Sequence, residues 1–253
     1  MPFTFAHPAA VLPLKKKWPG LFDSTALILG SMAPDFEYFL RFKAQGVIGH
    51  TPGGFFYFNL PLVCIAALLW HYILKKPFVH SIPAPFQRYF IPALKSSAKA
   101  VSFSRVPVFI LSAIFGMMTH VFWDAFTHAD GFFVKRLEFL TCHLNMGDMN
   151  IPVYKVLQHG STLAGLGIIA AYLYLNGRKI DIVLPGRNRG KQVCYWASVL
   201  LITAGIFLYR ILFTLDAIRL SHYGIYIVSL LSGVIIAITA VSAIFNVFRV
   251  YDT

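Results

Sequence analysis

The sequence predicts an all-α protein, a multi-pass bundle of transmembrane helices with about five spans and a half-buried helix near the N-terminus. Three observations support this fold class. Of the 253 residues, 57% are hydrophobic and only 13% are charged, whereas soluble domains carry about 25% charged residues. The mean hydropathy is +0.67. Several stretches are apolar over about the 20 residues that cross the hydrocarbon core of a bilayer.

Five stretches are long and apolar enough to be spans, and the third of them is short and rich in glycine. They cover approximately residues 55–74, 108–126, 161–175, 193–214 and 223–248. The stretch 21–40 carries Asp35 and Glu37 in its middle, so it is too polar to cross alone. We expect it to be a buried or half-inserted helix that ends near Pro34, because proline disfavours a helical conformation at the residue before it.

The chain is expected to form a single integral membrane domain over residues 1–253. Within it, residues 1–170 form a candidate metal-site core, and 193–248 form two C-terminal spans. The N-terminal MPFTFAHPAAVLPLKKK is not a typical cleavable signal, because its charges follow the apolar part instead of preceding it. His7 is therefore expected to remain in the mature protein.

Charge composition indicates a membrane partner. Lys and Arg total 22 against 10 Asp and Glu, a net charge of +12. Because most of the surface is apolar, we expect the basic loops to meet membrane lipids with anionic headgroups and not nucleic acid. Residues 75–107 mix cations with aromatic side chains, which is typical of a segment on the membrane surface; a solvated loop is the alternative. The sequence does not indicate the oligomeric state.

Composition also excludes several classes of protein: a disordered chain, a soluble basic nucleic-acid-binding domain, and a secreted module held by disulfides. The three cysteines are scattered and form no CxxC metal motif. Counting Lys and Arg by alternating sides gives twelve against nine. The positive-inside rule then puts the N-terminus, and the candidate site described next, on the extracytoplasmic face.

The motif HVFWDAFTH at 120–128 is the densest group of polar side chains in a span. His120 and Asp124 are four residues apart, so on a helix their Cβ atoms are about 6 Å apart on one face. Such a pair can ligate one divalent cation; a buried His–Asp hydrogen bond is the alternative. On a straight helix His128 would be about 12 Å from His120. Either the helix therefore ends at Thr127–Gly131 and the chain curls back, or Asp124 bridges two metal ions.

Four further candidates lie in loops around the first three spans. His7, Asp35 and His50 precede the first span, and His159 opens the third. Two crossings separate the first three from HVFWDAFTH and His159, so all four are expected at the same membrane face as HVFWDAFTH. Each has a plain structural alternative, as a helix cap, a turn residue or a solvated loop side chain. Arg210, near the end of the fourth span, could bind an anionic substrate or extend to the lipid headgroups.

Four segments carry a resemblance to a known family: PFTFAHPAAVLPL, LGSMAPDFEYF, HVFWDAFTH and VYKVLQHGST. They resemble a prokaryotic membrane family catalogued as domain of unknown function number 4184, over most of residues 1–170. More remotely, the order His, Asp, His, HxxxD, His, His is similar to membrane-bound metal-dependent hydrolases and to zinc-dependent phospholipase C. In those enzymes a zinc cluster inside a helical bundle hydrolyses phosphodiesters.

The resemblance implies seven metal ligands and a location in the prokaryotic inner membrane. The ligands would be His7, Asp35, His50, His120, Asp124, His128 and His159. The sequence departs from the phospholipase pattern at Leu163, where that pattern has a Glu, and at His128, which follows Asp124 more closely. One or two ions are therefore expected in place of three.

These observations together predict a membrane-embedded hydrolase of phosphoesters or lipid-linked substrates. A divalent ion, expected to be zinc, would lower the pKa of a bound water to about 7. Asp35 and Asp124 would be ligands and, where not fully engaged, the general base. The alternative is a non-enzymatic multi-pass membrane protein whose His/Asp cluster is structural or takes part in transport. A transporter would be expected to carry polar groups along several spans near the midplane.

Overall fold

The structure is a computed structural model that confirms the all-α class. It describes residues 3–18, 20–83, 86–95, 105–147, 149–178, 180, 188–214 and 222–251. Parts of the basic connections 75–107 and 176–192 therefore lie outside the described residues, as does Arg219. Within the described residues, regular structure is helical apart from one short β-hairpin.

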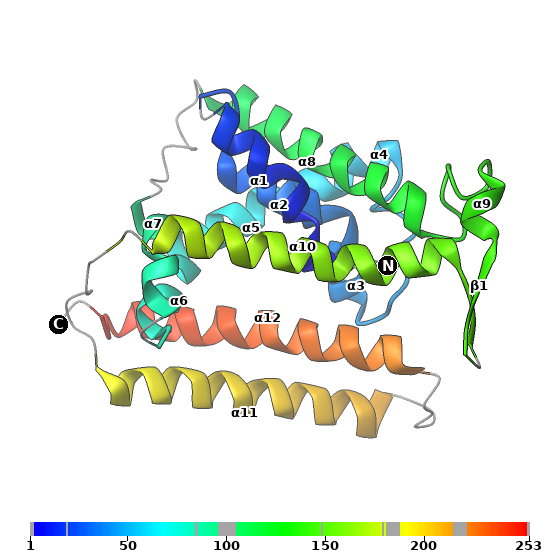
Figure 1. The fold of residues 1–253 in the computed structure, drawn as a ribbon. Helices are drawn as coiled ribbons and strands as arrows, with labels where there is room; N and C mark the ends of the chain where they lie inside the picture. The colour runs from blue at the N-terminus through cyan, green and yellow to red at the C-terminus, as the bar shows by residue number, and fades with distance from the viewer. Residues whose placement is uncertain are drawn as a thin grey trace. The chain divides into compact units, whose positions relative to one another are not determined.

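The helices follow one another along the whole chain (Figure 1). They are α1 (Pro8–Lys17), α2 (Ser24–Met32), α3 (Phe36–Arg41), α4 (Pro52–Gly54), α5 (Leu60–Leu68), α6 (Lys75–Ser81), α7 (Ile91–Lys95), α8 (Val106–Thr127), α9 (Glu138–Thr141), α10 (Val153–Gly177), α11 (Arg189–Thr214) and α12 (Tyr223–Val247). Single turns of 3-10 helix cover Thr4–Ala6, Ala33–Asp35 and Phe86–Tyr89, and π-helical turns cover Phe55–Asn59 and Leu69–Leu74. The strands are β1 (His143–Met146) and β2 (Met149–Pro152).

Five continuous helices are long and apolar enough to cross a membrane, as predicted, which indicates a multi-pass membrane protein. They cover Pro52–Ser81, Val106–Thr127, Val153–Gly177, Arg189–Phe213 and Tyr223–Val247. The first runs through α4, α5 and α6, so the start of the predicted surface segment 75–107 belongs to a span helix. The half-buried helix is α2, which ends at Met32, just before Pro34 as expected.

The third span begins earlier than the sequence indicates. Helix α10 starts at Val153 and not near residue 161. Hydropathy detects the part of a helix that matches hydrocarbon, whereas a helix continues into polar sequence as long as its backbone hydrogen bonds are made. His159 therefore lies inside α10 and does not open the helix, which corrects the expected position.

The chain divides into two compact units. The first unit contains Met1–Asp35, Ile48–Cys64 and Lys99–Tyr172, and the second contains Phe36–Val47, Ile65–Ala98 and Leu173–Thr253. The expected single domain over 1–253, with 1–170 as its site core and 193–248 as two C-terminal spans, stays a prediction.

Helices α2 and α8 form the centre of the first unit, and glycines let them approach closely. A Cβ at Gly30 would stand 2.3 Å from the carbonyl oxygen of Ala113, and a Cβ at Gly116 would stand 2.5 Å from that of Leu27. Both distances are shorter than real carbon–oxygen contacts, so the two backbones can touch only because these residues lack a side chain. The backbone NH of Asp23 also donates to Ser112 Oγ at 2.9 Å, which joins the start of α2 to α8.

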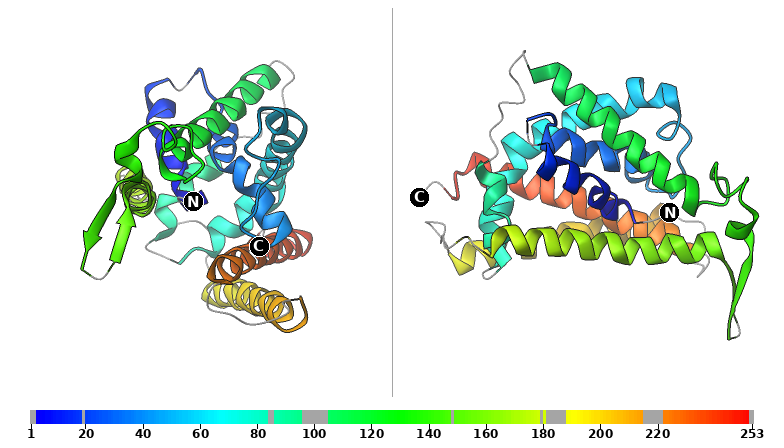
Figure 2. Two further views of the ribbon diagram at one scale, coloured as in Figure 1. Left: turned by 90° about the vertical axis from the view of Figure 1, so that its right-hand side faces the viewer. Right: turned by 45° about the horizontal axis from the view of Figure 1, so that its top comes forward.

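The chain before α1 lies against α10 in the same unit. The NH of Phe3 donates to Thr162 Oγ1 at 3.1 Å, and Gly165 leaves room for the Ala6 carbonyl, which a Cβ would approach to 2.9 Å. The hairpin of β1 and β2 leads into α10 (Figure 2). Its strands pair antiparallel, with Met146 opposite Met149. Gly147 turns the chain there with a φ of +64°, a conformation that glycine adopts without strain.

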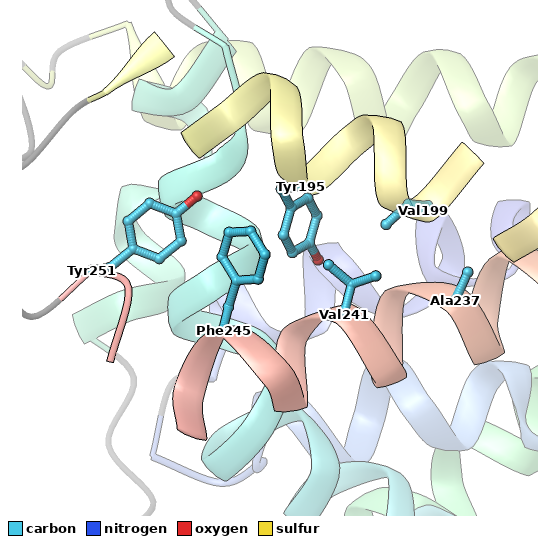
Figure 3. Close-up of a cluster of buried hydrophobic side chains, with 6 residues drawn as sticks. All are labelled: Tyr195, Val199, Ala237, Val241, Phe245 and Tyr251. Carbon is cyan, nitrogen blue, oxygen red and sulfur yellow. The ribbon is translucent and has the colours of Figure 1, made fainter. Parts of the chain in front are cut away.

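In the second unit, α11 and α12 lie side by side (Figure 1). A cluster of buried side chains fills the space between them and is drawn in Figure 3. We call it the α11–α12 cluster; it contains Tyr195, Val199, Ala237, Val241, Phe245 and Tyr251. The Tyr195 side chain of α11 brings a hydroxyl into this cluster. That hydroxyl lies 2.9 Å from Ser242 Oγ on α12.

Candidate metal centre

Four side chains from three separate segments of the first unit meet at the end of α8. They are Asp35, His50, His120 and Asp124. Each offers one ligand atom, and these atoms all lie within 4.8 Å of one another. We call this group the four-ligand cluster. The predicted convergence of distant loops on HVFWDAFTH is therefore found for Asp35 and His50, and the cluster is a possible metal-binding site.

The distances within the four-ligand cluster suit one small divalent ion. His120 Nε2 lies 3.2 Å from Asp124 Oδ2 and 3.5 Å from Asp35 Oδ1, and His50 Nε2 lies 3.5 Å and 3.6 Å from the same two oxygens. Ligands about 2.0–2.1 Å from a tetrahedral ion are separated from each other by about 3.4 Å. The four separations, from 3.2 to 3.6 Å, lie on either side of this value, so one ion could bind all four atoms with little movement.

Asp35 reaches the cluster because of how α2 ends. Helix α2 packs closely against α8. The 3-10 turn Ala33–Asp35, which follows α2, then directs the Asp35 carboxylate towards α8. Thr4 Oγ1 donates a hydrogen bond of 2.6 Å to Asp35 Oδ2. This bond engages one oxygen and leaves Oδ1 facing His50 and His120. Such hydrogen bonds from outside the ligand set orient metal-binding carboxylates.

His50 is positioned by the residue before it. A Cβ at Gly49 would stand 2.2 Å from the carbonyl oxygen of Pro34, so only glycine lets the loop lie against the turn that carries Asp35. Asn59 Nδ2 donates to the Gly49 carbonyl at 2.6 Å and holds the loop in place. Thr51 then caps the following helix, because its Oγ1 accepts the NH of Gly54 at 3.0 Å.

His120 is oriented through its other ring nitrogen. Its Nδ1 lies 2.7 Å from the carbonyl oxygen of Ser31, an acceptor, so Nδ1 carries the proton and donates it. Nε2 then faces Asp35 Oδ1 and Asp124 Oδ2. A histidine that donates from one nitrogen to a carbonyl and ligates through the other is the usual arrangement at metal sites.

His7 lies beside the four-ligand cluster, on the other side of Asp124. Its ring stacks on His120 with centroids 3.8 Å apart, and its Nε2 lies 3.7 Å from Asp124 Oδ1. Burial, together with the neighbouring His120, lowers the pKa of His7 to about 3. The imidazole is therefore neutral at pH 7 and has a lone pair to offer.

The position of His128 shows where α8 ends, whereas the number of ions at Asp124 stays a prediction. Helix α8 ends at Thr127, and His128 takes an extended conformation with a ψ of 143°, so the chain turns back as the first possibility required. His128 Nδ1 comes within 3.5 Å of Asp124 Oδ1. Asp124 thus faces His50 and His120 with Oδ2, and His7 and His128 with Oδ1.

Several buried atoms of this site have no hydrogen-bond partner among the described residues. They are both ring nitrogens of His7, Nε2 of His120, and the Oδ1 atoms of Asp35 and Asp124. Most buried polar atoms in proteins are hydrogen-bonded, and an exception calls for a physical cause such as a bound ion. A simple His120–Asp124 hydrogen bond, the structural alternative, accounts for neither His7 nor Asp35.

The remaining two predicted site residues are placed differently. His159 is exposed in the second turn of α10, and among the described residues no contact joins its ring to the cluster. Arg210 belongs to the second unit, where its guanidinium lies 5.8 Å from the centroid of the Phe42 ring. Their assignments as a metal ligand and as a substrate-binding group stay predictions.

The site is closed on one side and open on the other. The side chains of Asp35 and His120 are fully buried, whereas those of His50 and His128 are 29% and 28% exposed. Burial lowers the pKa of His128 as well. A water molecule or a substrate would therefore approach past His50 and His128.

Sequence reasoning missed the residues that position the ligands, namely Thr4, Ser31, Gly49 and Asn59. A threonine three residues before His7 and a carbonyl on α2 carry no distinctive pattern. Gly49 next to His50 is the one visible signal, because a glycine directly before a candidate ligand can mark a close backbone approach.

Comparison with known proteins gives the family of the chain. Neither a curated protein nor a solved structure matches it. A family model does match, over residues 1–245, and this range contains all of the site described above. The chain therefore belongs to the family described as domain of unknown function (DUF4184).

Proposed function

We propose that the protein is a membrane-embedded, metal-dependent hydrolase of phosphoester or lipid-linked substrates. The observation that carries the proposal is the four-ligand cluster, in which two imidazoles and two carboxylates meet in the geometry of one ion. Its place at the end of a span helix suits substrates whose ester lies at headgroup depth. The remote similarity of the His/Asp order to metal-dependent hydrolases agrees with this reaction class.

Two nitrogen and two oxygen ligands fit zinc better than calcium or magnesium, which prefer oxygen ligands alone. A bound ion of this kind lowers the pKa of a water molecule to about 7 and stabilises negative charge that develops on a phosphoryl oxygen. His120 and Asp35 would hold the buried side of the site; His120 Nδ1 donates to the Ser31 carbonyl, and Asp35 Oδ2 accepts from Thr4 Oγ1. His50 completes the site on the open side.

A second ion is supported by the two-sided environment of Asp124. Its Oδ2 belongs to the four-ligand cluster, while its Oδ1 faces His7 Nε2 at 3.7 Å and His128 Nδ1 at 3.5 Å. Asp124 Oδ1 and His7 Nε2 would help to hold a second ion, and two-metal sites place their ions about 3.5–4 Å apart; His128 Nδ1 also lies 3.1 Å from the Asp124 carbonyl oxygen. Where the second position is not filled, Asp124 Oδ1 is the oxygen with no hydrogen-bond partner, and it can accept the proton of the attacking water.

The cellular setting is part of the same proposal. The excess of Lys and Arg on the loops that share a side with 75–107 supports an extracytoplasmic site in a prokaryotic inner membrane. Anionic lipid headgroups are then the partners of the basic loops.

The test is metal analysis and turnover of the full-length protein in detergent. We expect one or two zinc or manganese ions per chain, hydrolysis of a generic phosphodiester, loss of both on dialysis against a chelator, and recovery of both on reloading. His120→Asn should remove the metal of the four-ligand cluster, whereas His71→Asn, on a histidine that the site does not use, should retain it. Folded wild-type protein that binds no divalent metal would overturn the proposal.

A structural metal centre is the second candidate, favoured by the complete burial of Asp35 and His120, since structural ions are usually closed off from solvent. It predicts stoichiometric metal that greatly raises the unfolding temperature, with no turnover of phosphodiesters or phospholipids. Metal-dependent turnover that His120→Asn abolishes would exclude it.

A further inference from the structure

A cavity of about 670 Å³ runs along α8 in the first unit, and Trp123 is among the residues that line it. Its wall is almost entirely apolar. The wall includes Phe115, Met118, Phe122 and Phe126 of α8, Leu157 of α10 and Ala10 of α1. Met118 and Phe122 are 56% and 62% exposed, so the cavity is a groove that opens sideways from the span helix.

One end of this groove adjoins the candidate metal centre. Trp123 lines the groove, and its ring meets the His7 ring edge-on with centroids 5.3 Å apart. Thr127 lines it too, and Thr127 Oγ1 lies 3.4 Å from His128 Nδ1. His7 and His128 are the two residues that face Asp124 Oδ1, so single side chains separate the groove from the centre.

The apolar wall and the membrane setting of the groove indicate its occupant. The stretch of α8 from Phe115 to Thr127 is about 18 Å long at 1.5 Å per residue. It belongs to a helix that is long and apolar enough to cross a membrane, so the groove would open towards the hydrocarbon chains of lipids. One hydrocarbon chain is the occupant that is apolar, narrow and abundant around a membrane span.

Charge complementarity links this occupant to the centre. A divalent ion at Asp124 would attract an anionic phosphoester, while the groove offers apolar side chains and would exclude charge. We propose that the substrate is a phosphoester lipid, with one hydrocarbon chain in the α8 groove and its headgroup phosphate at the metal centre. This inference rests on the proposed hydrolase function and assigns its substrate class and the residues that select it.

The first test needs no turnover. A phospholipid with a photoreactive diazirine in one acyl chain is incorporated with the full-length, metal-loaded protein into lipid nanodiscs and irradiated. We expect crosslinks at Phe122, Phe126 and Leu157, detected by mass spectrometry. Met118→Trp should fill the groove and lower these crosslinks at least about tenfold, since excluding two methylene groups already has an effect of that size.

Leu111→Trp is the matched control, because Leu111 is 66% exposed on α8 but does not line the groove. It should leave the groove crosslinks unchanged. Crosslinks that are spread evenly over all lipid-facing side chains, or that Met118→Trp does not reduce, would overturn the lipid-chain site.

The second test compares two substrates that share a phosphodiester and differ in their chains. Met118→Trp should lower turnover of the long-chain lipid at least about tenfold and leave turnover of a chainless phosphodiester and the metal content unchanged. Equal loss for both substrates would overturn the inference. Groove-selective crosslinks without hydrolysis of either substrate would instead contradict the proposed hydrolase function and leave the lipid-chain site standing.

Discussion

The candidate metal centre of the first unit and the α11–α12 cluster of the second bury polar groups in different ways. In the second unit the Tyr195 hydroxyl is 2.9 Å from Ser242 Oγ, and Trp196 Nε1 donates to the carbonyl of Ser81 at 2.8 Å. In the first unit the ring nitrogens of His7 and Nε2 of His120 are buried without a hydrogen bond.

Single atoms such as Thr203 Oγ1 and Ser229 Oγ in the second unit also lack a hydrogen-bond partner among the described residues, so the difference is that in the first unit several such atoms lie together. A buried donor without a partner is unfavourable by about 1–3 kcal/mol, and several such groups at one place multiply that loss. In the second unit the Tyr195 hydroxyl and the indole NH of the neighbouring Trp196 find partners within the protein. At the candidate metal centre the groups gather where an ion could bind. Substitutions at the candidate metal centre should therefore affect metal binding and turnover, whereas substitutions in the α11–α12 cluster should lower the free energy of unfolding.

The largest effect is expected from Asp124→Asn, because Asp124 faces four imidazoles. Hydrolysis of a phosphodiester should fall about a thousandfold, in line with the several kcal/mol that a bound ion contributes to a transition state. The unfolding temperature of the metal-free protein should change little, because removal of a buried charge offsets the loss of its contacts with the imidazoles. Turnover and thermal unfolding of the chelated protein measure the two effects.

Asp130→Asn is the control for that experiment, since the Asp130 side chain is exposed and pairs with Lys135 at 3.3 Å. Asp130→Asn should change neither the turnover of a phosphodiester nor the unfolding temperature of the chelated protein. A metal-free Asp124→Asn protein that unfolds at a much lower temperature than the metal-free wild type would assign Asp124 to the fold, and the contrast between the two regions would fail.

Phe245→Ala should give the opposite pattern. Phe245 is 8% exposed between α11 and α12, and truncating a buried aromatic ring leaves a cavity that lowers the free energy of unfolding by about 3 kcal/mol. Metal content and turnover, measured well below the new unfolding temperature, should equal those of the wild type. A loss of bound metal in the folded variant would show that the two units do not act separately.

Thr4→Val tests the support of a ligand and should have an intermediate effect. It removes the 2.6 Å hydrogen bond to Asp35 Oδ2 with little change of shape. Loss of such an orienting bond lowers metal affinity about 10–100-fold, which competition with a metal-binding dye measures. Thr239→Val, at a half-buried threonine of α12 in the second unit, is the control, and equal affinities of the two variants would contradict the role of Thr4.

His159→Gln should have the smallest effect. The His159 side chain is exposed and has no contact with the four-ligand cluster among the described residues, so metal content and turnover should change less than about twofold, as for most surface substitutions. Loss of an ion in this variant would support His159 as the seventh metal ligand that the resemblance implies. It would also show that α10 moves towards the centre when metal binds.

The sequence determines the elements of this protein that depend on neighbouring residues. The five spans could be predicted because the length of an apolar run is set by the thickness of the bilayer. The pair of His120 and Asp124 could be predicted because residues four apart share a helix face. Span ends were less accurate, as the early start of α10 shows, since helical hydrogen bonding continues beyond the apolar run.

Only the tertiary structure decided which candidates meet. Asp35 and His50 reach His120 through backbone contacts at Gly30, Gly49 and Gly116, and a glycine in the sequence does not say which chain it will touch. The choice of the Asp124 oxygen that faces each histidine, and the outward position of His159, follow from the packing of separate helices. Pattern along the chain is local, whereas a metal centre is built from side chains that become neighbours only when the chain has folded.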